Sequence, residues 1–380
     1  MEDKDILAFH DADSMISYLD SKEKNSEWIQ DVSIEDCEFV GVENAGELPF
    51  DCNDAGINTV INGTQLFIKI PEREQMLPLR DCAMQSVYDR TRTRCGFVSA
   101  LPVKRRAELL TEAASYINVS CRGGNSNPKV EAKKEKKLGI LSVVDDKVSC
   151  FLSGNGTSND YTIHSSTNLL LNTRDIVDSI GETQKFLGFY SYTGLDASWL
   201  TDKVIEDIDP ESITDYYVEF HVATSDIGLG AISLNGRLSD GLGTIIPIGS
   251  KQKILHRRNT TKEDVLEALD SLLKAINGTK ADMDKLKTVI VEYPVECLQH
   301  IVKELDLPLK TSLEIISNYK DVYGTGVANG YTLYLVLCQI IGRLEDVEPE
   351  AFGYRNTQER SVLKALSPKV WEKNDYPDIK

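Results

Sequence analysis

A short basic run is the part of this sequence best suited to bind an anion. It reads Lys251-Gln-Lys-Ile-Leu-His-Arg-Arg258, and its candidate nucleic-acid-binding residues are Lys251, Lys253, His256, Arg257 and Arg258. The run leads into a predicted helix, and the start of a helix favours phosphate because the helix dipole is positive there. We therefore expect this run to contact the phosphates of a nucleic acid. The alternative is an exposed strand end whose cations pair with nearby carboxylates.

Two further basic clusters would lengthen such a contact. The first is Lys104-Arg105-Arg106, which we include among the candidate nucleic-acid-binding residues. The second lies between residues 133 and 137, where a solvated loop is the favoured explanation. Tyrosines on predicted strands, such as Tyr190, are candidate platforms for stacked bases, although core packing explains them about as well.

Catalytic and metal chemistry lack the residue patterns that they need. None of the five histidines sits in a metal-binding or triad-like context, and the H-E-x-x-H, G-x-S-x-G and G-x-x-x-x-G-K-[ST] signatures are absent. The eight cysteines are scattered without a C-x-x-C pair, which indicates buried thiols in a reducing compartment. We expect no catalytic residue, no metal and no cofactor, and a protein that is not an enzyme.

Length and hydropathy narrow the class of protein. A chain of 380 residues exceeds the roughly 250–300 residues at which single cores stop growing, so we expect more than one folding unit. No stretch approaches the roughly 18–20 apolar residues of a membrane span. The opening Met1-Glu-Asp-Lys-Asp lacks the features of a secretion signal. We expect a cytoplasmic protein with no membrane partner.

Charge is distributed unevenly along the chain. The net charge is -18, yet residues 1–60 hold 16 acidic and 3 basic side chains, whereas residues 61–140 hold 8 acidic and 15 basic ones. A negative surface repels nucleic acid. The asymmetry therefore indicates either that the acidic segment shields a basic surface or that it is itself presented to a basic partner. A merely solvated surface is the third explanation.

The first 120 residues predict a small mixed unit. Residues 57–70 alternate around Asn62-Gly63, a dipeptide that favours a tight hairpin. Helical spacing follows over residues 79–90 and 102–117. The glycine-, asparagine- and lysine-rich stretch 121–137 predicts a basic linker.

The next segment, residues 138–280, predicts an α+β core in the order β-β-α-β-β-β-α. The expected elements before its last helix cover residues 138–144, 148–152, 169–180, 185–192, 216–223 and 230–238, and residues 243–248 add a further short run. The closing helix, 261–276, is expected to begin with a capping box between Thr260 and Glu263. Strands joined by hairpins form an antiparallel sheet, and we expect the helices on one of its faces.

Residues 281–380 predict helices only. They are expected over residues 294–305, 308–319, 328–344 and 357–366. The third is apolar nearly all round, which indicates a helix buried in a bundle or between subunits. We therefore divide the chain into an acidic mixed α/β unit (1–120), a basic linker (121–137), an α+β core (138–280) and an all-helical subdomain (281–380).

Several segments, in this order, resemble the phage/plasmid-like protein family, a domain of unknown function. They are Phe220-His-Val-Ala-Thr-Ser-Asp-Ile-Gly228 with Ala231-Ile-Ser-Leu234, then His256 ahead of Asp264-Val-Leu-Glu-Ala-Leu269, and later Tyr323-Gly-Thr-Gly326. The similarity covers about residues 75–345. At Asn235-Gly236 this chain departs from the family's cysteine–asparagine pair. The resemblance implies a mobile-element origin and a bacterial host cell, and it implies no mechanism.

The sequence therefore leads to two functional hypotheses. In the first, a phage- or plasmid-encoded, oligomeric, non-enzymatic protein binds single-stranded nucleic acid, as an annealing or recombination accessory; the predicted β-β-α-β-β-β-α order is similar to the core of single-strand annealing recombinases. In the second, the acidic surface docks on a host defence protein in place of DNA. A nucleotide-processing enzyme is a third possibility without a supporting motif. We expect a homo-oligomer under the first hypothesis.

Overall fold

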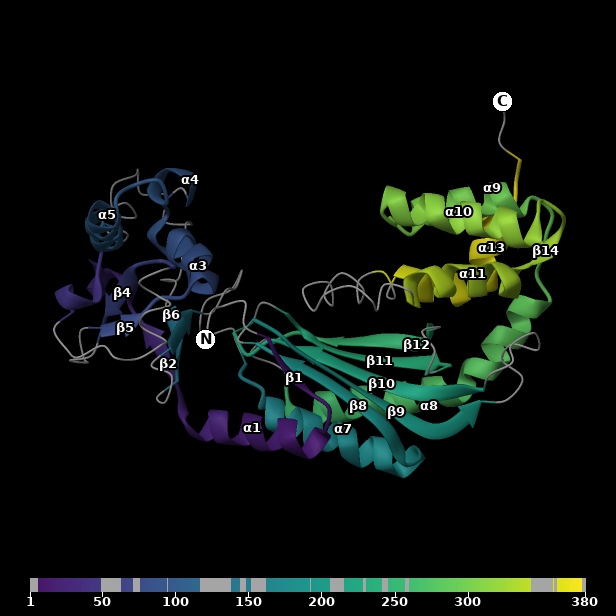
Figure 1. Cartoon of the computed structure of the whole chain (residues 1–380), viewed down its shortest axis with the longest axis horizontal. Helices are drawn as coiled ribbons and strands as arrows, with labels where there is room; N and C mark the ends of the chain where they lie inside the picture. Colours follow the sequence, from purple (N-terminus) through teal and green to yellow (C-terminus); the bar gives the residue numbers. More distant parts are fainter. Residues whose placement is uncertain are drawn as a thin grey trace, which may run out of the picture.

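The computed structural model describes most of the chain. It covers residues 6–48, 63–70, 76–93, 95–116, 138–143, 148–151, 162–191, 193–205, 215–227, 230–240, 245–256, 260–342, 358 and 361–377. The chain has an α+β fold in which antiparallel sheets are combined with helices (Figure 1). Among these residues, no helix has both the length and the apolar composition needed to cross a membrane.

The centre of the molecule is a six-stranded antiparallel sheet. Its strands, in spatial order, are β1 (Leu7–Phe9), β8 (Thr183–Tyr190), β9 (Leu195–Ile205), β10 (Tyr216–Thr224), β11 (Ile232–Ser239) and β12 (Ile245–Ile254). Strands β8 to β12 follow one another in both sequence and space, so each needs only a short connection to its neighbour. The edge strand β1 is added from the beginning of the chain.

Three helices cover one face of this sheet. They are α1 (Ala12–Lys24), α7 (Ser166–Ile180) and α8 (Lys262–Lys287), which lie beneath the strands in Figure 1. We call them the helical layer. The sheet side chains that meet it are apolar and fully buried, among them Trp199 and Phe220. Gly236 lets α8 approach closely, because a Cβ there would lie 3.0 Å from Ile276 Cγ1.

A smaller unit forms from the rest of the first half of the chain. One of its sheets combines β2 (Ser26–Val32), β6 (Leu138–Val143) and β7 (Val148–Phe151), and the other combines β3 (Glu38–Gly41), β4 (Leu66–Lys69) and β5 (Met76–Pro78). Its helices are α3 (Asp81–Thr91), α4 (Cys95–Val98) and α5 (Val103–Ser115), with short 3₁₀ turns η1 (Ile34–Asp36) and η2 (Ala45–Glu47). Its apolar core is separate from that of the large sheet.

The last part of the described chain is almost wholly helical. It contains α9 (Pro294–Glu304), α10 (Leu309–Tyr323), α11 (Gly330–Gly342), the turn η6 (Leu363–Leu366) and α13 (Pro368–Asn374). A two-stranded ribbon, β13 (Ile290–Val291) with β14 (Ala328–Asn329), links α8 to these helices. The Tyr334 hydroxyl donates to the Pro247 carbonyl at 2.8 Å, which fastens α11 to β12.

The structure divides the chain differently from the expected boundaries in two places. Residues 7–24 were expected in the N-terminal unit, yet β1 is an edge strand of the large sheet and α1 packs against α7. Conversely, the hairpin β6–β7 was expected to open the core domain, but it pairs with β2 of the small unit. The expected linker, 121–137, and the first strand of the hairpin around Asn62-Gly63 lie outside the described residues.

Candidate functional site

The basic run begins in the last part of strand β12 (Ile245–Ile254), and its last two residues lie outside the described residues. Lys251 and Lys253 lie on β12, where the Lys253 side chain is exposed. His256 comes directly after the strand. Arg257 and Arg258, on which the phosphate hypothesis depends most, lie outside the described residues. The structure therefore tests the surroundings of this run rather than its two arginines.

His256 points into the protein. Its Nδ1 lies 3.1 Å from the Thr162 carbonyl oxygen, which can only accept, so Nδ1 carries the proton. Its Nε2 then accepts from the Thr224 hydroxyl at 3.2 Å. Burial is the largest influence on the pKa of His256 and lowers it; the hydrogen bond to Thr162 opposes this shift, and the neighbouring His164 ring, 5.3 Å away, adds to it. His256 is therefore a neutral anchor at the end of β12 and contributes no positive charge to the run.

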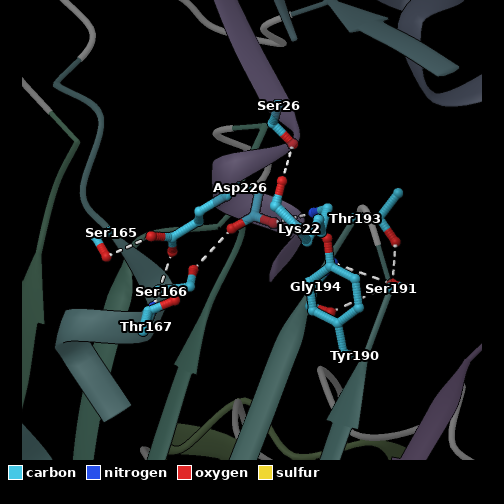
Figure 2. A network of polar contacts seen from close by, with 11 residues as sticks. Lys22, Ser26, Ser165, Ser166, Thr167, Tyr190, Ser191, Thr193, Gly194 and Asp226 are labelled. Carbon is cyan, nitrogen blue, oxygen red and sulfur yellow. Dashed lines mark hydrogen bonds and ion pairs between the residues drawn. The ribbon is translucent and has the colours of Figure 1, made fainter. Parts of the chain in front are cut away.

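A polar network joins α1, α7 and β8 to the end of β10 at one end of the sheet (Figure 2). The Asp226 carboxylate, just after β10, accepts from Lys22 Nζ at 2.6 Å, from the Ser166 hydroxyl at 2.7 Å and from the Tyr190 hydroxyl at 2.8 Å. Lys22 also lies 4.3 Å from the centre of the Tyr190 ring. Lys22 therefore attaches helix α1 to the sheet, through Asp226 at the end of β10 and Tyr190 on β8.

The start of α8 is closed by its own side chains. Thr261 is the N-cap, and the Thr261 backbone N–H donates to the Asp264 carboxylate at 2.6 Å while Asp264 N–H donates to the Thr261 hydroxyl. The expected capping box between Thr260 and Glu263 is therefore displaced by one residue. Two carboxylates, Glu263 and Asp264, already occupy the first turn, where a phosphate would gain from the helix dipole.

The second basic cluster is engaged within the small unit. Lys104 Nζ lies 3.1 Å from Glu47, whose hydrogen bond is the main cause of a raised Lys104 pKa, and Arg105 pairs with Glu108 at 2.6 Å. Arg106 donates to the carbonyls of Thr64, Ser99 and Leu101. The acidic segment and the basic cluster thus meet at Lys104 and Glu47, while Arg105 and Arg106 have their partners among residues 64–108.

The outer side of the helical layer is acidic. Its exposed carboxylates are Asp11, Asp13, Glu23, Asp175, Asp178, Glu263, Asp264, Glu267, Asp270, Asp282 and Asp284. The exposed cations of the same helices are fewer: Lys24, Lys262, Lys274, Lys280 and Lys285. Lys24 pairs with Asp20 and Lys285 with Asp282, and the half-buried Arg174 pairs with Asp13 at 2.6 Å. At the end of α7, a shallow hollow of about 750 Å³ is lined by Asp178, Glu182 and Asp202 together with Lys203. This surface was not singled out from the sequence, because its members come from three helices far apart along the chain.

The opposite face of the large sheet buries a chain of polar groups. His221 Nε2 lies 2.6 Å from Asp196 Oδ1, and His221 Nδ1 lies 3.1 Å from the Asn235 amide nitrogen. In this arrangement Nδ1 accepts from Asn235 and Nε2 donates to Asp196. Both ring nitrogens are therefore occupied, so His221 has none left to act as a base on a substrate.

Among the described residues there is no cluster of metal ligands, and the candidate platform Tyr190 is inaccessible. No group of three or more His, Cys, Asp and Glu side chains gathers among them with the geometry of metal ligands. Tyr190 is fully buried in the core, so a base from solution cannot stack on its ring. No family model matches the chain, and searches of curated proteins and of solved structures give no significant match.

Proposed function

We propose that this protein is a non-enzymatic binding protein whose acidic helical layer docks on a partner with a basic, nucleic-acid-binding surface. A host defence nuclease of the cell that carries a phage or plasmid is a partner of this class. One observation supports the proposal above the others: outward carboxylates outnumber cations across α1, α7 and α8. Cations such as Arg174 are themselves paired with carboxylates there.

The charge of the helical layer is expected to act mainly on the rate at which a basic partner associates, and less through tight local contacts. Surface charges of one sign raise the association rate of an oppositely charged partner, and added salt removes the effect. The hollow beside Asp178, Glu182 and Asp202 is also lined by Lys203, so its charged groups are three carboxylates and one cation. This negative balance favours a lysine or arginine side chain. Binding to such a surface is thus expected to be fast and strongly salt-dependent.

Truncation is a poor test of this proposal. Deleting residues 1–60 would remove β1 from the edge of the large sheet and α1 from its helical layer. Charge reversal at exposed positions leaves these elements in place. We choose Asp178→Lys, Glu267→Lys and Asp270→Lys together, since all three side chains are exposed on α7 or α8.

The measurement is fluorescence anisotropy of a labelled arginine-rich peptide of about ten residues, titrated at low and at higher salt. The triple variant should weaken binding about tenfold. A matched control, Glu112→Lys with Glu292→Lys and Glu372→Lys, makes the same charge change away from the layer. If both variants weaken binding equally, attraction depends only on net charge and the proposed docking face is wrong.

A second candidate function, binding of single-stranded nucleic acid by residues 251–258, is favoured by one observation. Lys253 is exposed on β12, and His256 fixes the point from which the chain enters Arg257 and Arg258. Arg257→Ala with Arg258→Ala should then reduce binding of a single-stranded oligonucleotide and lessen its salt dependence. Equal binding by the parent and this variant would remove the hypothesis.

A further inference from the structure

Helix α10 carries an apolar stripe on its solvent side. Leu309 and Leu313 are 75% and 59% exposed, Tyr323 is 40% exposed, and Ile316 between them is half-buried. The other side of the helix, with Ile315 and Tyr319, is buried in the helical subdomain. Figure 1 places α10 at the outer edge of that subdomain, where α9 and α11 are its helical neighbours.

The spacing of this stripe is that of helices that interlock with a second helix. Residues 309, 313, 316, 320 and 323 follow one another at alternating steps of four and three, the repeat of a coiled-coil seam. Exposed leucines are ordinary when they are isolated, whereas a continuous stripe marks a contact surface. Lys320 is the single charged member, and one lysine in such a seam selects a register at some cost in stability.

The charges beside the stripe indicate which partner fits. Lys310 and Asp321 are eleven residues apart, so they lie on the same flank of α10, roughly 16 Å apart along its axis. They are too distant to pair within one helix. In an antiparallel pair of two identical helices, each Lys310 meets the Asp321 of the other helix. In a parallel pair, the same flank of the two helices would lie on opposite sides of the seam, so Lys310 would not meet Asp321 of the other helix.

We propose that α10 is a self-association surface, and that two copies of this chain pair antiparallel through their α10 stripes. The proposal does not depend on the docking of a basic partner, because α10 belongs to the helical subdomain and not to the helical layer. A 15-residue helix is about 22 Å long. The contact is therefore smaller than the roughly 800 Å² per partner of a stable interface, and the dimer is weak, with a Kd of about 10–100 µM.

Sedimentation velocity of the full chain tests the stripe. Between about 1 µM and about 300 µM, the mass of the parent should rise from that of one chain toward that of two. Leu313→Asp places a carboxylate in the seam and should keep the protein monomeric throughout this range. Lys274→Asp on α8, an exposed charge change away from α10, should dimerise like the parent. A parent that stays monomeric, or a Leu313→Asp variant that still dimerises, overturns the proposal.

A charge exchange tests the antiparallel arrangement. Lys310→Asp alone and Asp321→Lys alone each replace two attractions by two repulsions, and each should weaken the dimer about tenfold. The double variant restores both attractions and should bind within about threefold of the parent. Because the two residues do not meet within one chain, recovery requires contact between copies. Failure of the double variant to recover would show that this pairing is wrong, and unchanged thermal unfolding of all variants checks that the fold is intact.

Discussion

Strand β10 buries both of its faces, but with opposite chemistry. Val218, Phe220 and Val222 point toward the helical layer and are at most 1% exposed. On the other face, Glu219 and His221 are 7% and 1% exposed. The apolar face is stabilised by removing hydrocarbon from water. On the polar face, burial of His221 and Glu219 is offset by their partners Asp196, Asn235 and Arg237.

The polar face is organised by cross-strand register. His221 lies opposite Asn235 on β11 and Ser198 on β9, and Glu219 lies opposite Arg237, whose Nη1 is 3.5 Å from its carboxylate. Each polar side chain is therefore positioned by the backbone pairing of a neighbouring strand. Alternation of apolar and polar residues along a strand therefore shows which residues share a face. It does not show whether the polar face is exposed to water.

The largest expected effect is a cavity in the apolar face. Trp199 is fully buried and its ring lies 5.0 Å from that of Phe186. Trp199→Ala should lower the free energy of unfolding by about 4 kcal/mol, because the helical layer cannot collapse fully into the space. Urea unfolding followed by circular dichroism measures this. Leu200→Ala, at the next, half-buried position, should cost clearly less; equal losses would break the distinction between the two faces.

Removing one member of the ion pair on the polar face should lower the free energy of unfolding nearly as much. Glu219→Ala leaves Arg237 buried without that carboxylate and should lower the free energy of unfolding by about 3 kcal/mol. Replacing both residues, by Glu219→Leu with Arg237→Met, should return the protein to within about 1 kcal/mol of the parent. The same urea titration measures both variants. If the double variant is as unstable as Glu219→Ala, the loss does not come from leaving Arg237 without its carboxylate partner.

The α+β class and many of its elements follow from local patterns. The structure confirms the helix expected over 169–180, which runs Ser166–Ile180, and the strands expected over 216–223 and 230–238. Strand β9 was not predicted, because short residues such as Ala197 and Ser198 weaken its alternation. Helix α8 continues past Gly278 to Lys287, since one glycine costs a helix only about 1 kcal/mol.

Long-range pairing could not be predicted in the same way. The hairpin β6–β7 was recognised, but no local signal shows that its partner is β2, more than a hundred residues earlier. The same limit applies to the candidate site. Lys22 and Asp226 are 204 residues apart, and Lys104 meets Glu47 from another element. A basic run shows where cations lie along the sequence. Whether carboxylates from other elements pair with them depends on tertiary contacts.

The basic cluster on α5 contains both kinds of polar group: Arg106 is hydrogen-bonded to the backbone, whereas Lys104 is exposed to water. Arg106 donates to three backbone carbonyls, so Arg106→Ala should lower the free energy of unfolding by about 2 kcal/mol. Lys104 is exposed and pairs with an exposed Glu47, so Lys104→Ala should leave the midpoint of urea unfolding unchanged within error. Equal losses for the two variants would contradict the assignment of Arg106 to the backbone.

The smallest expected effect is a dependence on pH that arises at His256. Burial holds the pKa of His256 below its ordinary value, and burial does the same at His164. The unfolded chain protonates these rings as the pH falls through about 6.5, while the folded protein resists the proton. Their stabilising contribution is therefore complete above about pH 6.5 and decreases as the pH falls through that value toward the lower, folded-state pKa.

This dependence separates a buried, neutral His256 from a cationic one. Urea midpoints between about pH 7.5 and about pH 5.5 should fall for the parent, and His256→Asn should reduce that fall. The exposed His10, changed to Asn, is the matched control and should leave the slope as it is. If the parent instead became more stable as the pH fell, His256 would be charged in the folded protein, and it would return to the basic run as a phosphate ligand.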